Sequence, residues 1–503
     1  MNSLEINKIK SISENNTSKI LDDDVLGTSG LINQGNTCYM NSIIQCLSNC
    51  EDFRNLIIGK DLIPNLIDNE SNIFIEKNKL ESNLSYQLRK IFINIWNSSF
   101  YSFRPISFRK LFGKKIEQFQ NSNQQDSQEA LLCILDSIND ELAKDADIKP
   151  LNKTIIYDYL EHLHSDEYMN HEAILKIIKS NLSDYLKYKS INDYKISHKK
   201  FSPINSIFEG RTISQLVCSE TNGIRTNFES FFYLTIALPQ EKYLNMPDSE
   251  SSEISDDKSN ENDKEKVKTL SENPDSYNIY EYEYSNESES TDSESDKESD
   301  KESDKDSDQN TDKNSDQDSD KDSVKSYSNL NTLNLFKKAN NKSLKKFTLY
   351  DLLNNHIIPE KLDNDNKWFS PYANKLVDAE KINLIWESPK ILIILLKRFE
   401  YSYNGAIKLN NIIEFPFNNL DITPYLHPNH VSEYTKYDLF AINNHTNFSN
   451  FGFNGISFGH YYSYCKNYTN DKWYNYDDET VNEIDENDLI TEHAYMLFYK
   501  AIN

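Results

Sequence analysis

Cys38 is the residue whose surroundings most suggest nucleophilic chemistry. It follows the turn-forming run "NQGNT" and opens the stretch "CYMNSIIQCLSN", in which apolar residues recur at helical spacing. A cysteine attacks a carbonyl only as its thiolate, and a free thiol, with a pKa of roughly 8.5, is mostly protonated near neutral pH. A helix start favours negative charge by roughly 0.3–1 kcal/mol, and a nearby histidine would act as the base. A lone cysteine at a helix start is more often a small buried core residue, so Cys38 needs partners elsewhere in the chain.

His460 and Asp477 are the residues that would make Cys38 a nucleophile. His460 follows a glycine at the head of an aromatic strand-like run, and Asp477 ends the next such run, 17 residues further on. Two antiparallel strands joined by a turn would place this carboxylate beside the imidazole and fix its tautomer. Asn33 could donate its side-chain amide to a tetrahedral oxyanion, a role worth roughly 3–4 kcal/mol where measured. Taken singly, His460 also fits a structural histidine, and Asn33 a turn residue.

The helices that must position Cys38 are predicted from apolar periodicity. Residues with a spacing of i, i+3, i+4 and i+7 form one apolar face after Cys38: Met40, Ile43, Ile44 and Leu47. A second helix is predicted over "DSQEALLCILDSINDEL", where Asp126 can cap the start and Glu129 can reach back in a capping box. Residues 145 to 200 have weaker helical periodicity and are predicted to form an extra helical excursion.

Strands are predicted from about Thr226 onward. The run "NFESFFYLTIAL" is aromatic and β-branched, and "KILIILLKRFEY" is apolar at consecutive positions, as expected for a strand buried on both faces. "FTLYDLLNN" is typical of a short helix. Further strand-like runs are "YDLFAINNH", "HYYSYCKN", "KWYNYDD" and "AYMLFYKA". Helices first and strands later predict an α+β fold.

Residues 240–344 interrupt this pattern. Their stretch "ESESTDSESDKESDKESDKDSDQNTDKNSDQDSDKD" contains no hydrophobic residue, so it cannot bury the apolar surface that would offset chain entropy. We therefore predict a disordered acidic low-complexity insertion over 240–344 and a flexible tail over 1–28. The remaining residues, 29–239 and 345–503, are predicted to form one catalytic domain.

The charge and cysteine content exclude several classes of protein. The 503 residues carry a net charge of −26, and residues 249–322 alone hold 27 Asp and Glu against 9 Lys, a net charge of −18. Phosphate binding needs a basic face, so we expect no nucleic-acid partner, whereas a basic protein could bind the insertion. Six cysteines without a C-x-x-C pair are not a disulfide scaffold, and the longest aliphatic run, "ILIILL", is too short to span a membrane. We expect an intracellular monomer, cytoplasmic or nuclear, without a membrane segment.

Several motifs, taken in order, resemble the ubiquitin-specific proteases, a papain-like family of cysteine deubiquitinases. "GLINQGNTCYMNSIIQCL" is similar to the family's cysteine box, and "QQDSQEAL" to its Gln-Gln-Asp helix motif. "SIFEGRTISQLVC", "LKRFEY" and "IIEFPFNNLDI" follow in the family's order. "FGHYYSYCKN", "KWYNYDDETV" and "AYMLFY" resemble the histidine box and its ending. The resemblance implies a helical thumb over about 29–205, with a β-sheet palm and fingers formed by the remainder of the domain.

The resemblance also implies catalytic roles. Cys38 would be the nucleophile, His460 the general base and then acid, and Asp477 the orienting carboxylate, with Asp478 as the neighbouring alternative. Asn33 would help to form the oxyanion hole.

The implied substrate is the C-terminal Gly-Gly tail of ubiquitin on ubiquitinated proteins. Substrate contacts are expected from the glutamine–aspartate motif and the histidine box: Gln125, Asp126, Glu129, Gly459, Tyr461 and Tyr462. Asp126 and Glu129 would meet the arginines of the tail, although helix capping explains both residues equally well. Tyr461 and Tyr462 would form the walls of a channel that admits only glycine.

The sequence departs from the family at its zinc site. A zinc site of this kind needs four ligands. Of the four positions, Cys218 remains, whereas Thr221, Ser370 and Ala373 stand where cysteines are expected. We therefore expect no metal and no other cofactor. Two alternative functions remain open: an inactive ubiquitin-binding scaffold, and a hydrolase for another ubiquitin-like modifier.

Overall fold

The computed structural model describes most of the predicted domain. The described residues are 25–62, 78–97, 100–145, 181–218, 220, 223–238, 278–279, 346–370, 374–402, 405–447 and 459–502. They belong to one compact unit of residues 1–280 and 345–503, and the second unit, 281–344, lies outside them. The predictions of a flexible tail and of a disordered insertion therefore fall almost wholly outside the described residues.

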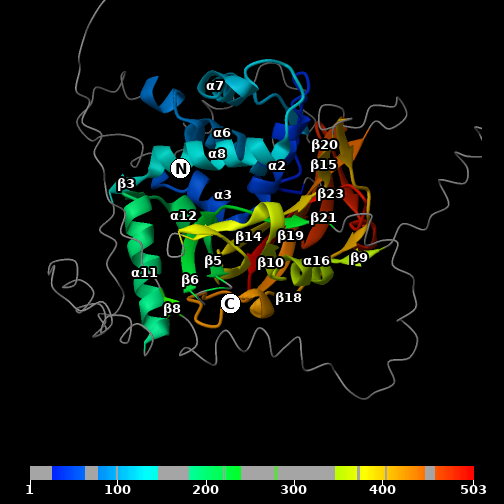
Figure 1. The fold of residues 1–503 in the computed structure, drawn as a ribbon. Coiled ribbons are helices and arrows are strands. Elements are labelled where there is room, and N and C mark those ends of the chain that lie inside the picture. Colours follow the sequence, from blue (N-terminus) through cyan, green and yellow to red (C-terminus); the bar gives the residue numbers. More distant parts are fainter. Residues whose placement is uncertain are drawn as a thin grey trace, which may run out of the picture. The chain divides into compact units, whose positions relative to one another are not determined.

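Helices form a layer on one side of the main sheet (Figure 1). Helix α2 (Cys38–Asn49) lies at the centre of this layer, and each of its residues is buried. The sequence predicted one apolar face, whereas the helix is buried on all sides. The buried side-chain amides of this helix donate to backbone carbonyls, Asn41 to that of Leu31 at 3.0 Å and Gln45 to that of Ser29 at 2.9 Å. The other helices in this layer are α3 (Glu51–Ile58), α6 (Leu84–Trp96), α7 (Ile106–Lys115), α8 (Ser127–Leu142) and α12 (Pro203–Phe208).

The main sheet has eight strands, and α2 packs chiefly against β20, with further contacts to β19 and β21. Their order is β22-β21-β20-β19-β23-β14-β7, with β18 paired to β19 outside this path. Neighbours are antiparallel except for β14 and β7, which run parallel. The strands are β7 (Leu234–Ala237), β14 (Ile391–Lys397), β18 (Leu420–Asp421), β19 (Lys436–Asn447), β20 (Gly459–Asn467), β21 (Lys472–Asp477), β22 (Thr480–Ile484) and β23 (Ala494–Ala501).

Strand β14 explains the continuous apolar run of the sequence. Ile391, Ile393 and Leu395 pack into the cluster shared with the helical layer. Leu392, Ile394 and Leu396 point to the opposite face and join a second cluster with α16 (Leu349–His356). Because successive side chains of a strand alternate between faces, a strand covered on both sides is apolar throughout. The prediction of a strand buried on both faces is confirmed for Ile391–Lys397, whereas the end of the predicted run forms a separate strand, β15 (Phe399–Ser402).

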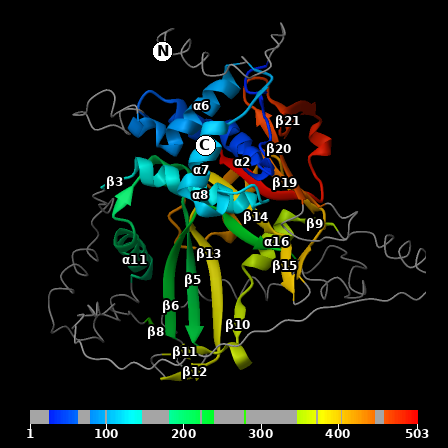
Figure 2. The same ribbon diagram turned by 90° about the horizontal axis from the view of Figure 1, so that it is seen from above.

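A second sheet extends away from the helices, as Figure 2 shows. Its order is β10-β13-β5-β6-β8, built from β5 (Gly210–Cys218), β6 (Gly223–Phe231), β8 (Asn278–Ile279), β10 (Glu360–Leu362) and β13 (Ala379–Glu387). The first strand of either large sheet therefore begins at Gly210, earlier than the predicted Thr226, and only short strand pairs precede it. The alternation in "GRTISQLVC" is weak because much of β5 is only partly buried, and cross-strand pairing with β6 and β13 holds it instead.

The remaining described elements are short, apart from α11 (Leu182–Ser197), which forms part of the predicted helical excursion. Residues 146–180 of that excursion lie outside the described residues. Short strand pairs are β1 (Gly30–Leu31) with β2 (Ser102–Phe103), β3 (Lys144–Asp145) with β4 (Lys200–Phe201), β9 (Phe347–Thr348) with β17 (Ile413–Glu414), β11 (Trp368–Ser370) with β12 (Lys375–Val377), and β15 (Phe399–Ser402) with β16 (Gly405–Lys408). Single 3₁₀ turns are η1 (Glu117–Phe119), η3 (Asn364–Asn366), η4 (Thr423–Tyr425) and η6 (Glu486–Asp488). Within the described ranges, none of the helices combines the length and the apolarity needed to cross a bilayer.

Candidate active site

Cys38 is the first residue of α2 and is 3% exposed. The loop before it turns sharply, with Gly35 at φ 91° and Asn36 at φ 52°, a region that favours glycine and asparagine. The side-chain oxygen of Asn33 accepts from the backbone N–H groups of Gly35 and Thr37, both at 3.0 Å. Asn33 thus shapes the loop that delivers Cys38 to the helix start.

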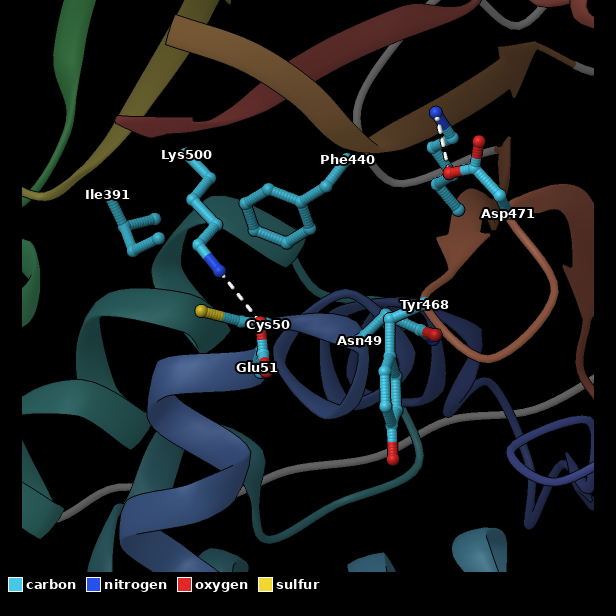
Figure 3. A pocket seen from close by; sticks show the side chains of 9 residues that line it. Asn49, Cys50, Glu51, Ile391, Phe440, Tyr468, Asp471 and Lys500 are labelled. Atoms are coloured by element: carbon cyan, nitrogen blue, oxygen red, sulfur yellow. Dashed lines mark hydrogen bonds and ion pairs between the residues drawn. The ribbon is translucent and has the colours of Figure 1, made fainter. Parts of the chain in front are cut away.

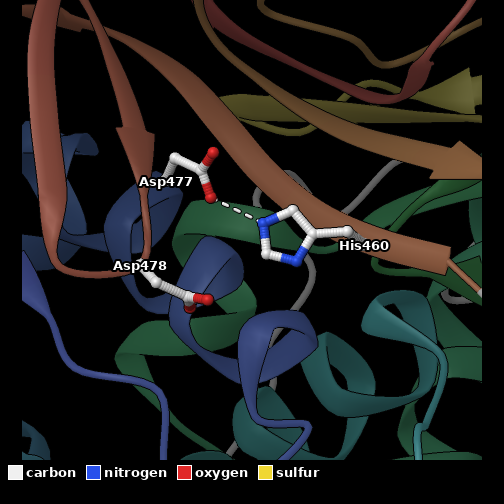
Figure 4. A group of neighbouring side chains, drawn as sticks. All are labelled: His460, Asp477 and Asp478. Carbon is white, nitrogen blue, oxygen red and sulfur yellow. Dashed lines mark hydrogen bonds and ion pairs between the residues drawn. The ribbon is translucent and has the colours of Figure 1, made fainter.

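His460 and Asp477 meet through the predicted hairpin. Strands β20 and β21 are antiparallel neighbours, and the His460 Nε2 lies 2.6 Å from the Asp477 Oδ1 (Figure 4). The hydrogen bond to Asp477, followed by one to the side chain of Cys38, raises the pKa of His460 to about 10. His460 thus stands between a carboxylate and a cysteine, and both favour the protonated imidazole that forms when it accepts a proton.

Asp478 does not share the role of Asp477. Its backbone is in the left-handed region at φ 50°, which turns its carboxylate toward the loop before α2. Asn33 donates to it at 2.9 Å and Asn41 at 2.8 Å, while the backbone N–H of Leu31 donates to its carbonyl at 2.7 Å. Burial raises the pKa of Asp478. The two adjacent aspartates thus have separate partners: Asp477 orients His460, and Asp478 fixes Asn33.

Gln124 is a residue of this site that the sequence analysis did not select. Its Nε2 lies 3.3 Å from the Cys38 Sγ and donates to the Gly459 carbonyl at 3.1 Å. The signal in the sequence was the motif "QQDSQEAL", from which Gln125 was chosen. In the structure Gln125 turns away and donates to the Gln118 carbonyl at 3.0 Å. The periodic pattern could not distinguish these two glutamines because they precede the helix, in a loop without a regular phase.

Asp126 and Glu129 have different environments. Asp126 caps α8, because its carboxylate accepts from the Gln128 N–H at 2.8 Å, and it also accepts from the Tyr495 hydroxyl at 2.8 Å. Burial raises the pKa of Asp126 to about 6. Glu129 is exposed and accepts a hydrogen bond from Gln118. The predicted capping box is therefore only half formed.

Gly459, Tyr461 and Tyr462 lie along β20. An added Cβ at Gly459 would come within 2.4 Å of the Thr446 carbonyl oxygen, so only glycine fits there. Tyr461 packs into the cluster on the α2 side, whereas Tyr462 packs into the cluster on the other face. Adjacent residues of a strand point to opposite faces, so these two tyrosines do not line a single channel as predicted.

His460, Asp477 and Asp478 also form a group with metal-ligand spacing among the described residues. Their polar atoms already have protein partners, since Asp477 binds His460 and Asp478 accepts from two amides. Of the four family zinc positions, Cys218 and Ser370 are buried in the second sheet and its adjoining hairpin, and Thr221 and Ala373 lie outside the described residues. A single thiol with a serine hydroxyl does not fit a zinc site.

A cavity of about 140 Å³ lies at the opposite end of α2 from Cys38 (Figure 3). It is lined by Asn49, Cys50 and Glu51 on the helical side and by Phe440, Lys466 and Lys500 on the strands. Lys500 bridges to Glu51 at 2.7 Å. This cavity takes no part in the arrangement around Cys38.

A cysteine at a helix start, beside a histidine that an aspartate orients, is the arrangement of a papain-like cysteine hydrolase. The chain belongs to the ubiquitin carboxyl-terminal hydrolase family, whose model matches residues 29–499.

Relatives and solved structures agree with this assignment. "Ubiquitin carboxyl-terminal hydrolase 5" of Arabidopsis thaliana is 35% identical over 164 residues, which is 33% of this chain and 17% of that protein. "Probable ubiquitin carboxyl-terminal hydrolase R319" of Acanthamoeba polyphaga mimivirus is 23% identical over 94% of this chain and 90% of its own length. The structure is similar to that of the SAGA Ubp8/Sgf11/Sus1/Sgf73 DUB module bound to ubiquitin aldehyde, with a TM-score of 0.52 and 18% identity, covering 97% of this chain and 72% of that one. The predicted α+β papain-like fold of thumb, palm and fingers is confirmed.

Proposed function

We propose that the protein is a cysteine deubiquitinase that hydrolyses the isopeptide or peptide bond after the C-terminal Gly-Gly of ubiquitin. The observation that carries the proposal is the hydrogen-bonded pair of His460 and Asp477 beside Cys38, within a fold of the ubiquitin carboxyl-terminal hydrolase family. An inactive scaffold would have no need to keep these three side chains in contact.

Cys38 gives its proton to His460, and its Sγ attacks the carbonyl carbon of the terminal glycine. The electron pair of the C=O bond moves to oxygen, where the Cys38 backbone N–H and the amide of Asn33 stabilise it. His460 then passes the proton to the leaving amine, and an acyl-enzyme remains. Water, deprotonated by His460, attacks this thioester and releases the ubiquitin carboxylate and the Cys38 thiol. Asp477 keeps the imidazole in the required orientation throughout.

The residues proposed to meet the ubiquitin tail lie at the start of α8 and at the start of β20. Asp126 and Glu129 supply negative charge for the arginines of the tail, whereas the glycine at 459 is required by the close packing of β20 on Thr446 of β19. A buried carboxylate such as Asp126 is costly to keep charged, which favours a role beyond helix capping.

A ubiquitin-tail propargyl probe tests this proposal, because it reacts only with an activated cysteine. We expect one adduct on Cys38 of the full chain and none on Cys38→Ala, which should still bind ubiquitin. An unlabelled, folded wild-type protein that binds ubiquitin would support the scaffold instead. Fluorogenic substrates with the ubiquitin tail and with another modifier's tail, measured in parallel, test the substrate, and a large preference for the other tail would overturn it.

We further propose that the protein is an intracellular monomer, cytoplasmic or nuclear. All six cysteines are free thiols, which suits a reducing compartment. A basic protein is proposed as the partner of the acidic insertion, on the charge of its sequence alone.

A further inference from the structure

The amide of Gln124 bridges the two walls of the candidate active site. Its Nε2 donates to the Gly459 carbonyl, which fixes the orientation of the amide because a carbonyl oxygen can only accept. The same nitrogen lies 3.3 Å from the Cys38 Sγ, closer than the amide oxygen at 3.8 Å. One amide hydrogen is therefore anchored on Gly459 and the other is directed at the sulfur that would react.

The loop that carries Gln124 is held firmly by α7. The guanidinium of Arg109 donates to the carbonyls of Phe119 and Asn121, which lie a few residues before Gln124. Gly113 packs so closely on this loop that an added Cβ would come within 2.8 Å of the Phe119 carbonyl oxygen. The α8 cap begins two residues after Gln124. The amide of Gln124 is thus preorganised rather than free to search for a partner.

We infer that Gln124 is a further catalytic residue, whose amide donates to the Cys38 thiolate and then to the oxygen of the tetrahedral intermediate. This inference rests on the proposed function. As the bond from the Cys38 Sγ to the carbonyl carbon forms, the negative charge leaves sulfur and the C=O electron pair moves to oxygen. The oxygen is bonded to the attacked carbon and therefore lies near the sulfur, within reach of the same N–H. When the intermediate collapses, the charge leaves this oxygen, and His460 protonates the departing amine.

Gln124 would complement Asn33 rather than replace it. One amide hydrogen of Asn33 is already engaged by Asp478 at 2.9 Å, and its oxygen holds the loop before Cys38. Asn33 approaches from the loop that precedes α2, and Gln124 from the loop that precedes α8. The developing charge would then be stabilised from two independently anchored loops.

The test compares Gln124→Ala and Gln124→Glu with Asn123→Ala in the full chain. Asn123 is the exposed neighbour in the same loop. Removal of one oxyanion donor costs roughly 10²–10³-fold in kcat where measured. We expect a loss of about 10-fold to 100-fold in kcat for Gln124→Ala on a ubiquitin-tail fluorogenic substrate, with little change in KM. Gln124→Glu keeps the shape but loses the N–H, so it should lose at least as much, and Asn123→Ala should match the wild type.

Alkylation of Cys38 by iodoacetamide gives a second readout that requires no turnover. If Gln124 stabilises the thiolate, the pH midpoint of alkylation should move upward in both Gln124 variants and not in Asn123→Ala. A folded Gln124→Ala that keeps kcat within threefold, or one that gains activity, would overturn the inference and make Gln124 a latch across the cleft. If the wild type itself forms no adduct with the ubiquitin probe, the proposed function fails. The role of Gln124 is overturned separately if the pH midpoint of Cys38 alkylation is the same in the Gln124 variants as in the wild type.

Discussion

Asp126→Asn should make the protein more stable at alkaline pH while it weakens the binding of substrate. Asp126 is 8% exposed, and burial raises its pKa from 3.8 to about 6. This difference corresponds to a penalty of about 3 kcal/mol for the charged carboxylate in the folded state, at 1.36 kcal/mol per pKa unit. Because the folded pKa is the higher one, the stability is fully present below about pH 4 and is lost as the pH rises through about 6.

Asparagine stays neutral and avoids this penalty. Its side-chain oxygen can still cap α8 through the Gln128 N–H, but its amide N–H faces the Tyr495 hydroxyl, which must turn from donor to acceptor at a cost of about 1 kcal/mol. The net gain for Asp126→Asn at pH 8 is therefore about 2 kcal/mol, and it should shrink by more than 1 kcal/mol at pH 5. Urea denaturation at both pH values measures it, with Asp140→Asn, on the exposed face of the same helix, as the matched control.

The binding half of this prediction separates two roles for Asp126. If the carboxylate pairs with an arginine of the ubiquitin tail, its loss should raise KM about tenfold or more, as for other charge-assisted hydrogen bonds. If Asp126 serves only to cap α8, then KM should stay constant. A variant that is less stable than the wild type at pH 8 by more than 1 kcal/mol would refute the reasoning, because the charged form would then be the stabilising one.

Three further changes test the geometry around the cysteine. Asp477→Asn removes the largest cause of the raised pKa of His460, so the alkaline limb of the pH–rate profile should move to lower pH and kcat/KM should fall by about 10²–10⁴-fold; an unmoved limb would contradict the pairing. Asp478→Asn leaves one side-chain oxygen to accept from the amides of both Asn33 and Asn41, so kcat should fall about tenfold to a hundredfold while the pH profile keeps its shape. A shifted pH profile would mean that Asp478 acts through His460 instead. Deletion of residues 250–335 should change hydrolysis of a small ubiquitin-tail substrate less than twofold, and a large loss would assign the insertion a part in catalysis.

The sequence predicted the site best where the pattern is local. The helix after Cys38 follows from apolar spacing, and the meeting of His460 and Asp477 follows from two aromatic strands separated by a short turn. In both cases the residues that must meet belong to one element or to neighbouring elements. Local propensity is then sufficient to place them.

The sequence predicted less well where a contact spans most of the chain. The bond between Asn33 and Asp478 joins residues 445 positions apart, and nothing in either neighbourhood indicates it. The choice between Gln124 and Gln125 depends on how a loop is anchored by Arg109, which no periodicity reveals. The prediction that Tyr461 and Tyr462 line one channel could have been avoided from the sequence. Adjacent residues of a strand point to opposite faces of the sheet, so the two tyrosines cannot share a wall.

The position of the long insertion is explained by the closeness of its two ends in the fold. After β7 the described chain breaks off at Leu238, and it resumes at Lys346, just before β9 and α16; between them only β8 (Asn278–Ile279), paired with β6, is described. Helix α16 packs directly against β7, so the two ends of the insertion lie on adjacent elements of one core. The entropy of closing a loop grows only with the logarithm of its length, about 0.6 kcal/mol for each doubling, so a hundred residues between adjacent ends cost the fold little. The catalytic groups lie on α2, β20 and β21, none of which borders either end, and this separation is why hydrolysis should not depend on what the insertion contains.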